Sequence, residues 1–171
     1  MEEVAVEDQA VRIALPAVPM IPVPANLRKG QQTAEWVAAQ IRAYPEGHYQ
    51  GDWFYRHECK TTMCVAGWAA FAHGPEFLNG YCRPDVSHWS PDPIDGVRWE
   101  PAGQEALQLD DYCSSLLFSG ENSREYVLQA LDFLASDDAA AMDDTAKYER
   151  LRQIRHGDAP LLDEDELPYD Y

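Results

Sequence analysis

Apolar residues recur three and four positions apart in six parts of the chain. This is the spacing of residues that share one face of an α-helix. Short polar or proline-containing stretches separate the six segments. The pattern predicts a mainly α-helical fold, with helices at residues 33–44, 62–73, 101–108, 110–118, 123–135 and 145–156.

Side chains at the ends of these segments support the boundaries. Hydroxyl groups of Thr33, of Thr61 or Thr62, and of Ser123 are placed to accept hydrogen bonds from free backbone N–H groups at a helix start. Asp110 and Asp111 open another segment, where carboxylates interact favourably with the helix dipole. Pro45 ends the first helix, and Gly74-Pro75 ends the second.

The second predicted helix is the expected centre of the core. Cys64, Trp68 and Phe71 stand at positions i, i+4 and i+7, so their side chains share one face. Most of the remaining residues of this segment are alanine or glycine. Because glycine within a helix is unfavourable by roughly 1 kcal/mol relative to alanine, we expect a neighbouring backbone to pass close to Gly67.

The rest of the chain lacks helical periodicity. Prolines in residues 1–30 predict an extended N-terminal arm, since proline has no backbone N–H. The second half of the arm is expected to lie against one helical domain, residues 31–156. Within that domain we expect a small two-stranded element near residues 49–56 and an irregular loop at 79–100. We expect residues 137–144 to form an acidic joint, that is, a linker between two helices, and residues 157–171 to form an acidic, mobile tail.

The charge excludes several classes of partner. Of the 171 residues, 30 are acidic and 13 are Lys or Arg, which gives a formal net charge of −17. Such a chain repels nucleic acid and acidic lipid, so neither direct nucleic-acid binding nor membrane adsorption is expected. No apolar run approaches the roughly 20 residues of a membrane span, and the first ten residues are acidic where a secretory signal would be basic. We therefore expect a soluble, cytoplasmic protein.

The cysteines allow a metal hypothesis. Four cysteines without a secretory signal are expected to be thiols or metal ligands. His57, Cys59 and Cys64 follow a spacing that would place three zinc ligands around one turn and a helix start, with Cys82 or His88 as a fourth. Paired short spacings typical of zinc ribbons and fingers are missing. A buried, apolar Cys64 explains the same pattern without metal, so no cofactor is expected.

Cys64 also permits a catalytic hypothesis. A thiol in the first turn of a helix has a lowered pKa and becomes a nucleophile when a base is near. His57, His73 or His88 could be that base. Papain-like cysteine proteases also use an asparagine and an oxyanion-binding glutamine, and neither is identifiable at matching positions of this sequence. The buried-thiol interpretation again competes with this one.

Aromatic and acidic residues indicate where a partner would bind. Trp89 and Trp99 lie in or beside the irregular loop, where an exposed aromatic ring would anchor a partner. The same rings could instead fix the loop to the core. Carboxylates of the tail could imitate a phosphate array and bind a basic groove of another protein. These tail residues are Asp163, Glu164, Asp165 and Glu166.

Four segments of the chain resemble a family of small, uncharacterised proteins of actinobacteria and their bacteriophages. The shared features are a C-x-T-x-x-C-x-A-G-W/H-A motif, here CKTTMCVAGWA from Cys59 to Ala69, and a later helix ending in LF. The resemblance covers about residues 28–73 and 104–135. Lys60 stands where related sequences often have glycine. The resemblance implies a phage or actinobacterial origin and two cysteines that belong to the fold; it supplies no catalytic residues.

Together these features favour a small acidic accessory protein that binds another protein, a host protein if the gene is viral. The alternatives are a cysteine-dependent hydrolase built on Cys64 and His57, and a zinc-stabilised binding module.

Overall fold

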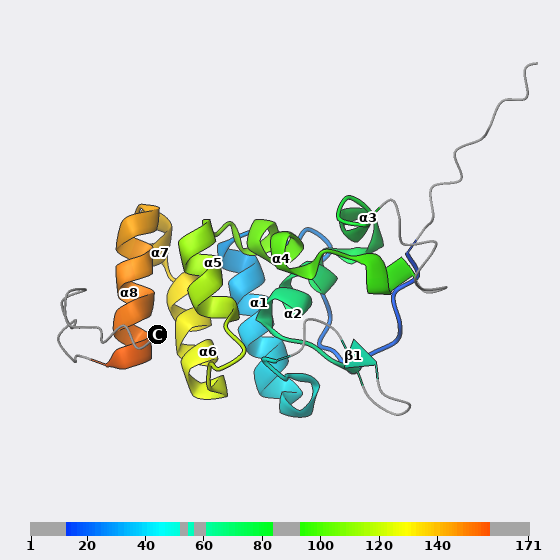
Figure 1. The fold of residues 1–171 in the computed structure, drawn as a ribbon, viewed down its shortest axis with the longest axis horizontal. Helices are drawn as coiled ribbons and strands as arrows, with labels where there is room; N and C mark the ends of the chain where they lie inside the picture. Colours follow the sequence, from blue (N-terminus) through cyan, green and yellow to red (C-terminus); the bar gives the residue numbers. More distant parts are fainter. Residues whose placement is uncertain (1–12, 52–54, 57–60, 84–92, 158–171) are drawn as a thin grey trace, which may run out of the picture.

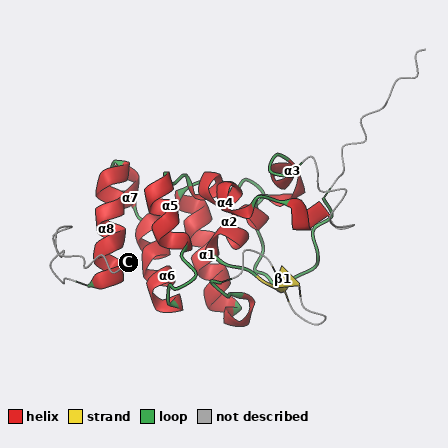
Figure 2. Ribbon diagram, in the orientation of Figure 1, coloured by secondary structure: helices red, strands yellow, loops and turns green. Residues whose placement is uncertain are grey.

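The computed structural model describes residues 13–51, 55–56, 61–83 and 93–157. Helices make up most of these ranges (Figure 2). The prediction of a mainly helical fold is therefore confirmed. The eight α-helices within the described residues are α1 (Gln31–Ala43), α2 (Val65–Ala72), α3 (Gly74–Asn79), α4 (Trp99–Leu107), α5 (Asp111–Phe118), α6 (Arg124–Leu134), α7 (Asp137–Ala141) and α8 (Asp144–His156).

The helices follow one another along the longest axis of the molecule (Figure 1). Helices α7 and α8 lie at one end, α5, α6 and α1 come next, and α3 lies at the other end. Helix α2 packs mainly against α4, α1 against α6, and α5 against α8. The largest apolar cluster draws on α1, α2, α4, α5, α6 and α8. A second cluster around Leu78, Ile94 and Trp99 adjoins it, because Leu15 and Phe77 contact both.

Helix α2 occupies the centre of the core, as predicted. Every one of its residues is buried. The side chain of Trp68 packs against the rings of Trp36 and Phe71, with centroid distances of 6.3 and 6.1 Å. Cys64, Trp68 and Phe71 are buried, as expected of core residues, but the rest of α2 is buried as well, so burial does not single out one face of the helix.

Small residues let α4 approach α2 closely. A β-carbon added to Gly103 of α4 would lie 2.6 Å from both the α- and β-carbons of Ala66. Such a distance is far inside van der Waals contact, so glycine is required at this point. Helix α4 therefore makes a close backbone contact at Ala66, the residue before Gly67.

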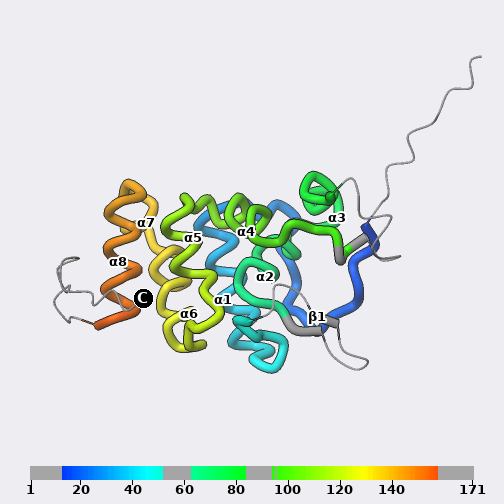
Figure 3. Tube along the Cα trace, in the orientation of Figure 1, coloured from blue at the N-terminus to red at the C-terminus, as the bar shows by residue number. Residues whose placement is uncertain are grey.

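The second half of the N-terminal arm lies against the body, as predicted. Its apolar side chains pack on the main cluster, and Figure 3 shows the segment running from the α3 end of the molecule toward α1. Gln40 of α1, which is fully buried, holds the arm with both ends of its amide. Its Nε2 donates to the carbonyl of Pro19 (3.0 Å), and its Oε1 accepts from the backbone N–H of Ile21 (2.8 Å).

Two predicted helix starts are wrong. Helix α1 begins at Gln31, after Gly30 in a positive-φ conformation, and the Thr33 hydroxyl donates instead to the carbonyl of Arg28 (3.0 Å). Helix α2 begins at Val65 with Cys64 at the N-cap position, so the start predicted at Thr61 or Thr62 is wrong. The two threonines form strand β2 (Thr61–Thr62), which pairs antiparallel with β1 (Tyr55–Arg56). The two-stranded element therefore extends beyond the predicted residues 49–56.

The later helix starts agree better with the predictions. Side chains of Asp110 and Ser123 cap α5 and α6 by accepting from the backbone N–H groups of Cys113 and Tyr126. The expected acidic joint at 137–144 is wrong, because its first half forms α7, capped by Ser136. Gly74 and Pro75 end α2 and also begin α3, a helix that the sequence pattern did not predict.

Several predicted features lie outside the described residues. They are the first part of the arm, residues 84–92 of the loop, and residues 158–171 of the tail. Across the part of the chain that is described, no helix combines the length and apolar character needed to cross a lipid bilayer.

Candidate functional site

A basic depression opens between the start of α1, the α4–α5 turn and helices α6 to α8. Its volume is about 640 Å³. Three of its twelve lining residues are basic, namely Arg28, Lys29 and Lys147, and none is acidic. In a chain where acidic residues outnumber basic ones 30 to 13, this lining is unusual. The depression is therefore suited to a group that carries negative charge.

Backbone geometry and hydrogen bonds fix the rim of the basic depression. Gly30, with φ of 80°, donates its N–H to the carbonyl of Ala106 (2.8 Å), which ties the start of α1 to α4. Gln108 takes a left-handed conformation directly after α4 and packs against Gly30. The Gln31 amide donates to the carbonyl of Ala135 (2.8 Å) and to Asp137 (3.0 Å). Hydrogen bonds thus connect the start of α1 both to α4 and to the α6–α7 connection.

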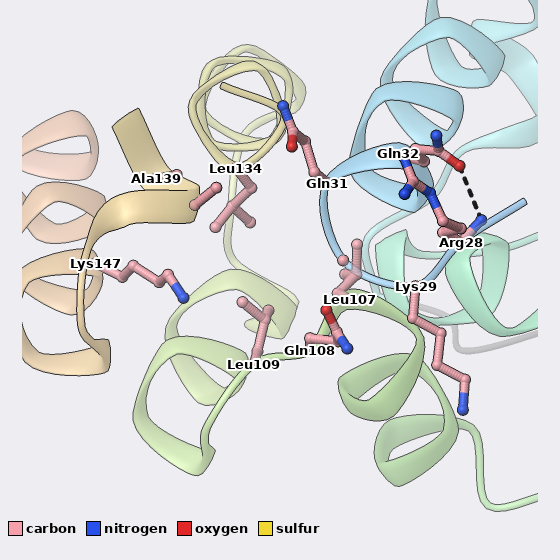
Figure 4. A pocket seen from close by; sticks show the side chains of 12 residues that line it. Arg28, Lys29, Gln31, Gln32, Leu107, Gln108, Leu109, Leu134, Ala139 and Lys147 are labelled. Atoms are coloured by element: carbon pink, nitrogen blue, oxygen red, sulfur yellow. Dashed lines mark hydrogen bonds between the residues drawn. The ribbon is translucent and has the colours of Figure 1, made fainter. Parts of the chain in front are cut away.

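Lys147 is the basic side chain that extends into the depression. Figure 4 shows it reaching from α8 toward Leu109. Only 20% of the side chain is exposed, and its ion pair with Asp144 is long, at 3.7 Å. Lys29, by contrast, points away from Lys147 and pairs with Glu105. Lys147 therefore has the greater capacity to take a new anionic partner.

An aromatic pair lies on α5 and α8, and we call it, with Arg152, the aromatic face. Tyr148 is half-buried and packs against the main apolar cluster, whereas Tyr112 is exposed. The rings of Tyr112 and Tyr148 meet edge to face with centroids 6.1 Å apart. Tyr112 is 73% exposed. The guanidinium of Arg152 lies 5.7 Å from the Tyr148 ring centroid, within the range of a cation–π contact. Lys147 of the basic depression directly precedes Tyr148 in α8.

A network of titratable groups joins α1, α3 and α4. Thr33 Oγ1 lies 2.8 Å from His73 Nε2, and Glu105 binds both Lys29 and the hydroxyl of Tyr81. Burial and the nearby Lys29 lower the pKa of His73. Hydrogen bonds from Lys29 and Tyr81 lower the pKa of Glu105. The bonds link residues distant in the chain, so the network has a clear structural role.

The nucleophile hypothesis receives no geometric support from the described residues. Cys64 is 1% exposed, at the residue that precedes α2, so a substrate has no access to its sulfur. His73 follows the last residue of α2, nine residues after Cys64, which corresponds to about 14 Å along the helix axis. His57 and His88 lie outside the described residues.

The other buried thiol is also unsuited to nucleophilic chemistry. Cys113 of α5 is fully buried, and its Sγ lies 3.6 Å from the carbonyl oxygen of Asp144, to which it donates. Burial, with a contribution from Asp110, raises the pKa of its thiol to about 12. Because the thiolate is the reactive form, Cys113 is held in the inert form.

The zinc hypothesis can be compared with the structure only in part. Among residues 13–51, 55–56, 61–83 and 93–157, no three His, Cys, Asp or Glu side chains gather in a way that could hold a metal ion. Cys64 and Cys82 belong to these ranges, whereas His57, Cys59 and His88 do not.

The predicted partner-binding residues fall into two groups. Trp99 is 7% exposed and belongs to the second apolar cluster, so the expectation of an exposed anchor there is wrong. Trp99 fixes the end of the loop to the core, which was the competing interpretation. The others lie outside the described residues: Trp89, Asp163, Glu164, Asp165 and Glu166.

Sequence reasoning missed both surface features. The basic depression brings together four segments that are far apart in the chain, so no local pattern marks it. Tyr112 did carry a signal, because it stands in the acidic first turn of a predicted helix and away from its apolar stripe. The comparisons add nothing to these observations: no family model, curated protein or solved structure matches this chain.

Proposed function

We propose that this protein is an accessory protein that acts by binding another protein through the aromatic face. The observation that carries the proposal is the 73% exposure of Tyr112 beside Tyr148. Tyrosine and arginine are enriched among the residues that contribute most to protein–protein affinity. The aromatic face combines two tyrosines with Arg152.

The supporting structure keeps the loss of conformational entropy on binding small. Tyr112 and Tyr148 both lie in helices that pack against each other, α5 and α8. Asp110 and Asp143 cap these helices through hydrogen bonds of 2.8 Å to backbone N–H groups. A tyrosine has few rotatable bonds, so ordering it in a complex costs little.

The net charge of −17 indicates the chemistry of the partner. Opposite charge speeds association, so a partner with a basic surface is favoured. Asp163, Glu164, Asp165 and Glu166 are further proposed contacts, on the basis of their charge. A phage origin and a host protein as partner belong to the same proposal. They rest on the resemblance alone.

Two exposed tyrosines permit a matched experiment. The full chain, its Tyr112→Ala variant and its Tyr49→Ala variant are immobilised and exposed to an actinobacterial lysate at low and high salt. Tyr49 is 59% exposed and does not belong to the aromatic face, so it controls for the loss of an exposed ring. We expect a protein captured by the wild type and by Tyr49→Ala, but not by Tyr112→Ala. Equal capture by all three chains, or none by the wild type, would contradict the proposal.

A further inference from the structure

We propose that the basic depression is the docking site for the acidic segment of the same chain, residues 158–171. The segment contains six acidic residues and no Lys or Arg. The lining of the basic depression contains three basic residues and no acidic one. Lys29 is already paired with Glu105, and Lys147 has a long ion pair with Asp144, so Lys147 and Arg28 are the basic residues proposed to bind carboxylates of the segment.

The acidic segment and the basic depression also both contain leucines, which could contact one another. The acidic run Asp163–Glu166 is flanked by Leu161-Leu162 and Leu167. Three mostly buried leucines belong to the lining of the basic depression: Leu107, Leu109 and Leu134. Carboxylates could pair with Lys147 and Arg28 while neighbouring leucines contact the apolar lining. The segment could make both ionic and apolar contacts with the basic depression. A small inorganic anion could make only the ionic contacts, so the segment is the favoured ligand.

The length of the chain fits this docking. Lys147 and Gly157 are ten residues apart, so α8 separates them by about 15 Å. An extended chain spans about 3.3 Å per residue, so the six residues from Gly157 to Asp163 reach about 20 Å and the nine to Glu166 about 30 Å. A segment that returned along α8 would therefore place the acidic run at the level of Lys147.

The conformation at the end of α8 allows the following segment to turn back along the helix. Gly157 has φ of 68°, a conformation that glycine adopts without strain and that other residues rarely adopt. The ion pair of Lys147 with Asp144 is long, at 3.7 Å, so Lys147 has capacity for a second carboxylate. Docking would hold the same carboxylates that we propose as partner contacts. A basic partner would then compete with the basic depression for them.

The experiment measures competition between the segment and a peptide copy of it. A fluorescent peptide of residues 158–171 is added to the full wild-type chain and to a full chain with D163N, E164Q, D165N and E166Q, here called the tail-neutral chain. Anisotropy at low salt gives both affinities. We expect the peptide to bind the tail-neutral chain about tenfold more tightly, because the wild-type segment already occupies the site.

Substitutions in the tail-neutral chain locate the site. We expect Lys147→Gln to weaken peptide binding about tenfold, since it removes a charge that pairs with the peptide. The control is Arg42→Gln, which removes one exposed positive charge at the far end of α1 and should leave the affinity unchanged. Circular dichroism checks that each variant is folded.

Four results would overturn the proposal. They are no binding to the tail-neutral chain, equal binding to both chains, insensitivity to Lys147→Gln, and equally tight binding of a peptide with the same composition in scrambled order. The last result would assign the basic depression to acidic peptides in general. None of these results depends on capture of a partner by the aromatic face, so this proposal and the proposed function fail separately.

Discussion

Tyr112 and Tyr148 form an edge-to-face contact, with an angle of 64° between their rings, while Tyr112 keeps 73% of its surface exposed. The contact orients the phenol without burying it. A side chain that served only the fold would be expected to bury more of its apolar surface. The proposed binding of a partner rests on this exposed ring.

Removing the Tyr112 ring should scarcely affect the fold. Because the ring is mostly exposed, we expect Tyr112→Ala to reduce the free energy of unfolding by less than about 1 kcal/mol. The matched substitution is Tyr126→Ala in α6, where the ring is 6% exposed. We expect that change to cost about 3–5 kcal/mol. Denaturant unfolding measures both, and a comparable loss in the two variants would show that Tyr112 serves the fold.

The contact of Gly103 with Ala66 yields a second prediction. Alanine is a better helix former than glycine by about 1 kcal/mol, yet the added β-carbon would lie 2.6 Å from Ala66. We expect the steric cost to exceed the gain, so that Gly103→Ala lowers the free energy of unfolding by about 1–3 kcal/mol. Gly80→Ala is the control, since its nearest contact would be 3.4 Å. Equal stability of the two variants would contradict the close packing of α2 and α4.

The contact also shows how far the sequence predicts the fold. The alanine-rich composition of 62–73 indicated a helix with close neighbours, and local caps at Asp110 and Ser123 marked helix starts correctly. The contact of Gly103 depends on α4, which begins at Trp99, 27 residues after the end of α2 at Ala72. Tertiary contacts also decided the role of Thr33, whose hydroxyl bonds Arg28 and His73 instead of capping α1.

Gln40 provides a test of the docked arm. Gln40→Leu would leave the N–H of Ile21 and the carbonyl of Pro19 without their partner. A buried polar group without a hydrogen bond costs about 1–3 kcal/mol, so we expect a total loss of about 2–4 kcal/mol in the free energy of unfolding. Gln129→Leu is the matched control, because Gln129 is exposed and bonds only to Glu125. A loss no larger than that of Gln129→Leu would mean that the arm contributes little to stability.

His48 should make stability depend on pH. Burial is the main reason why its pKa is lowered, and its Nε2 lies 3.1 Å from Gln50 Oε1. The unfolded state, with a histidine pKa near about 6.5, therefore binds a proton more readily than the folded state. Stability should be complete above that pH and decline as the pH falls below it.

Two variants isolate this contribution. We expect the slope of unfolding free energy against pH, between about 7 and 5, to decrease in His48→Gln, because the titrating group is removed. Gln129→Leu, which replaces an exposed residue that has no titratable group, should leave the slope unchanged. His73 has a lowered pKa as well and is retained in both variants, so its contribution cancels. An unchanged slope in His48→Gln would contradict the assignment.

The basic depression marks the limit of sequence-based reasoning about the site. Its basic residues Arg28 and Lys147 are separated by more than a hundred positions, and only the packing of α7 and α8 near the start of α1 brings them to one cavity. Tyr112 differs, because its position off the apolar stripe was visible in the sequence. Exposure itself, however, depends on how α8 packs beside α5.

Oxidative footprinting of the tyrosines in a complex with the captured protein tests the central claim most directly. Tyr112 and Tyr49 are the two large, strongly exposed apolar side chains among the described residues, so each serves as a reference for the other. The account predicts that the partner protects Tyr112 from modification and leaves Tyr49 as reactive as in the unbound chain. Unchanged reactivity of Tyr112 in a saturated complex would contradict it.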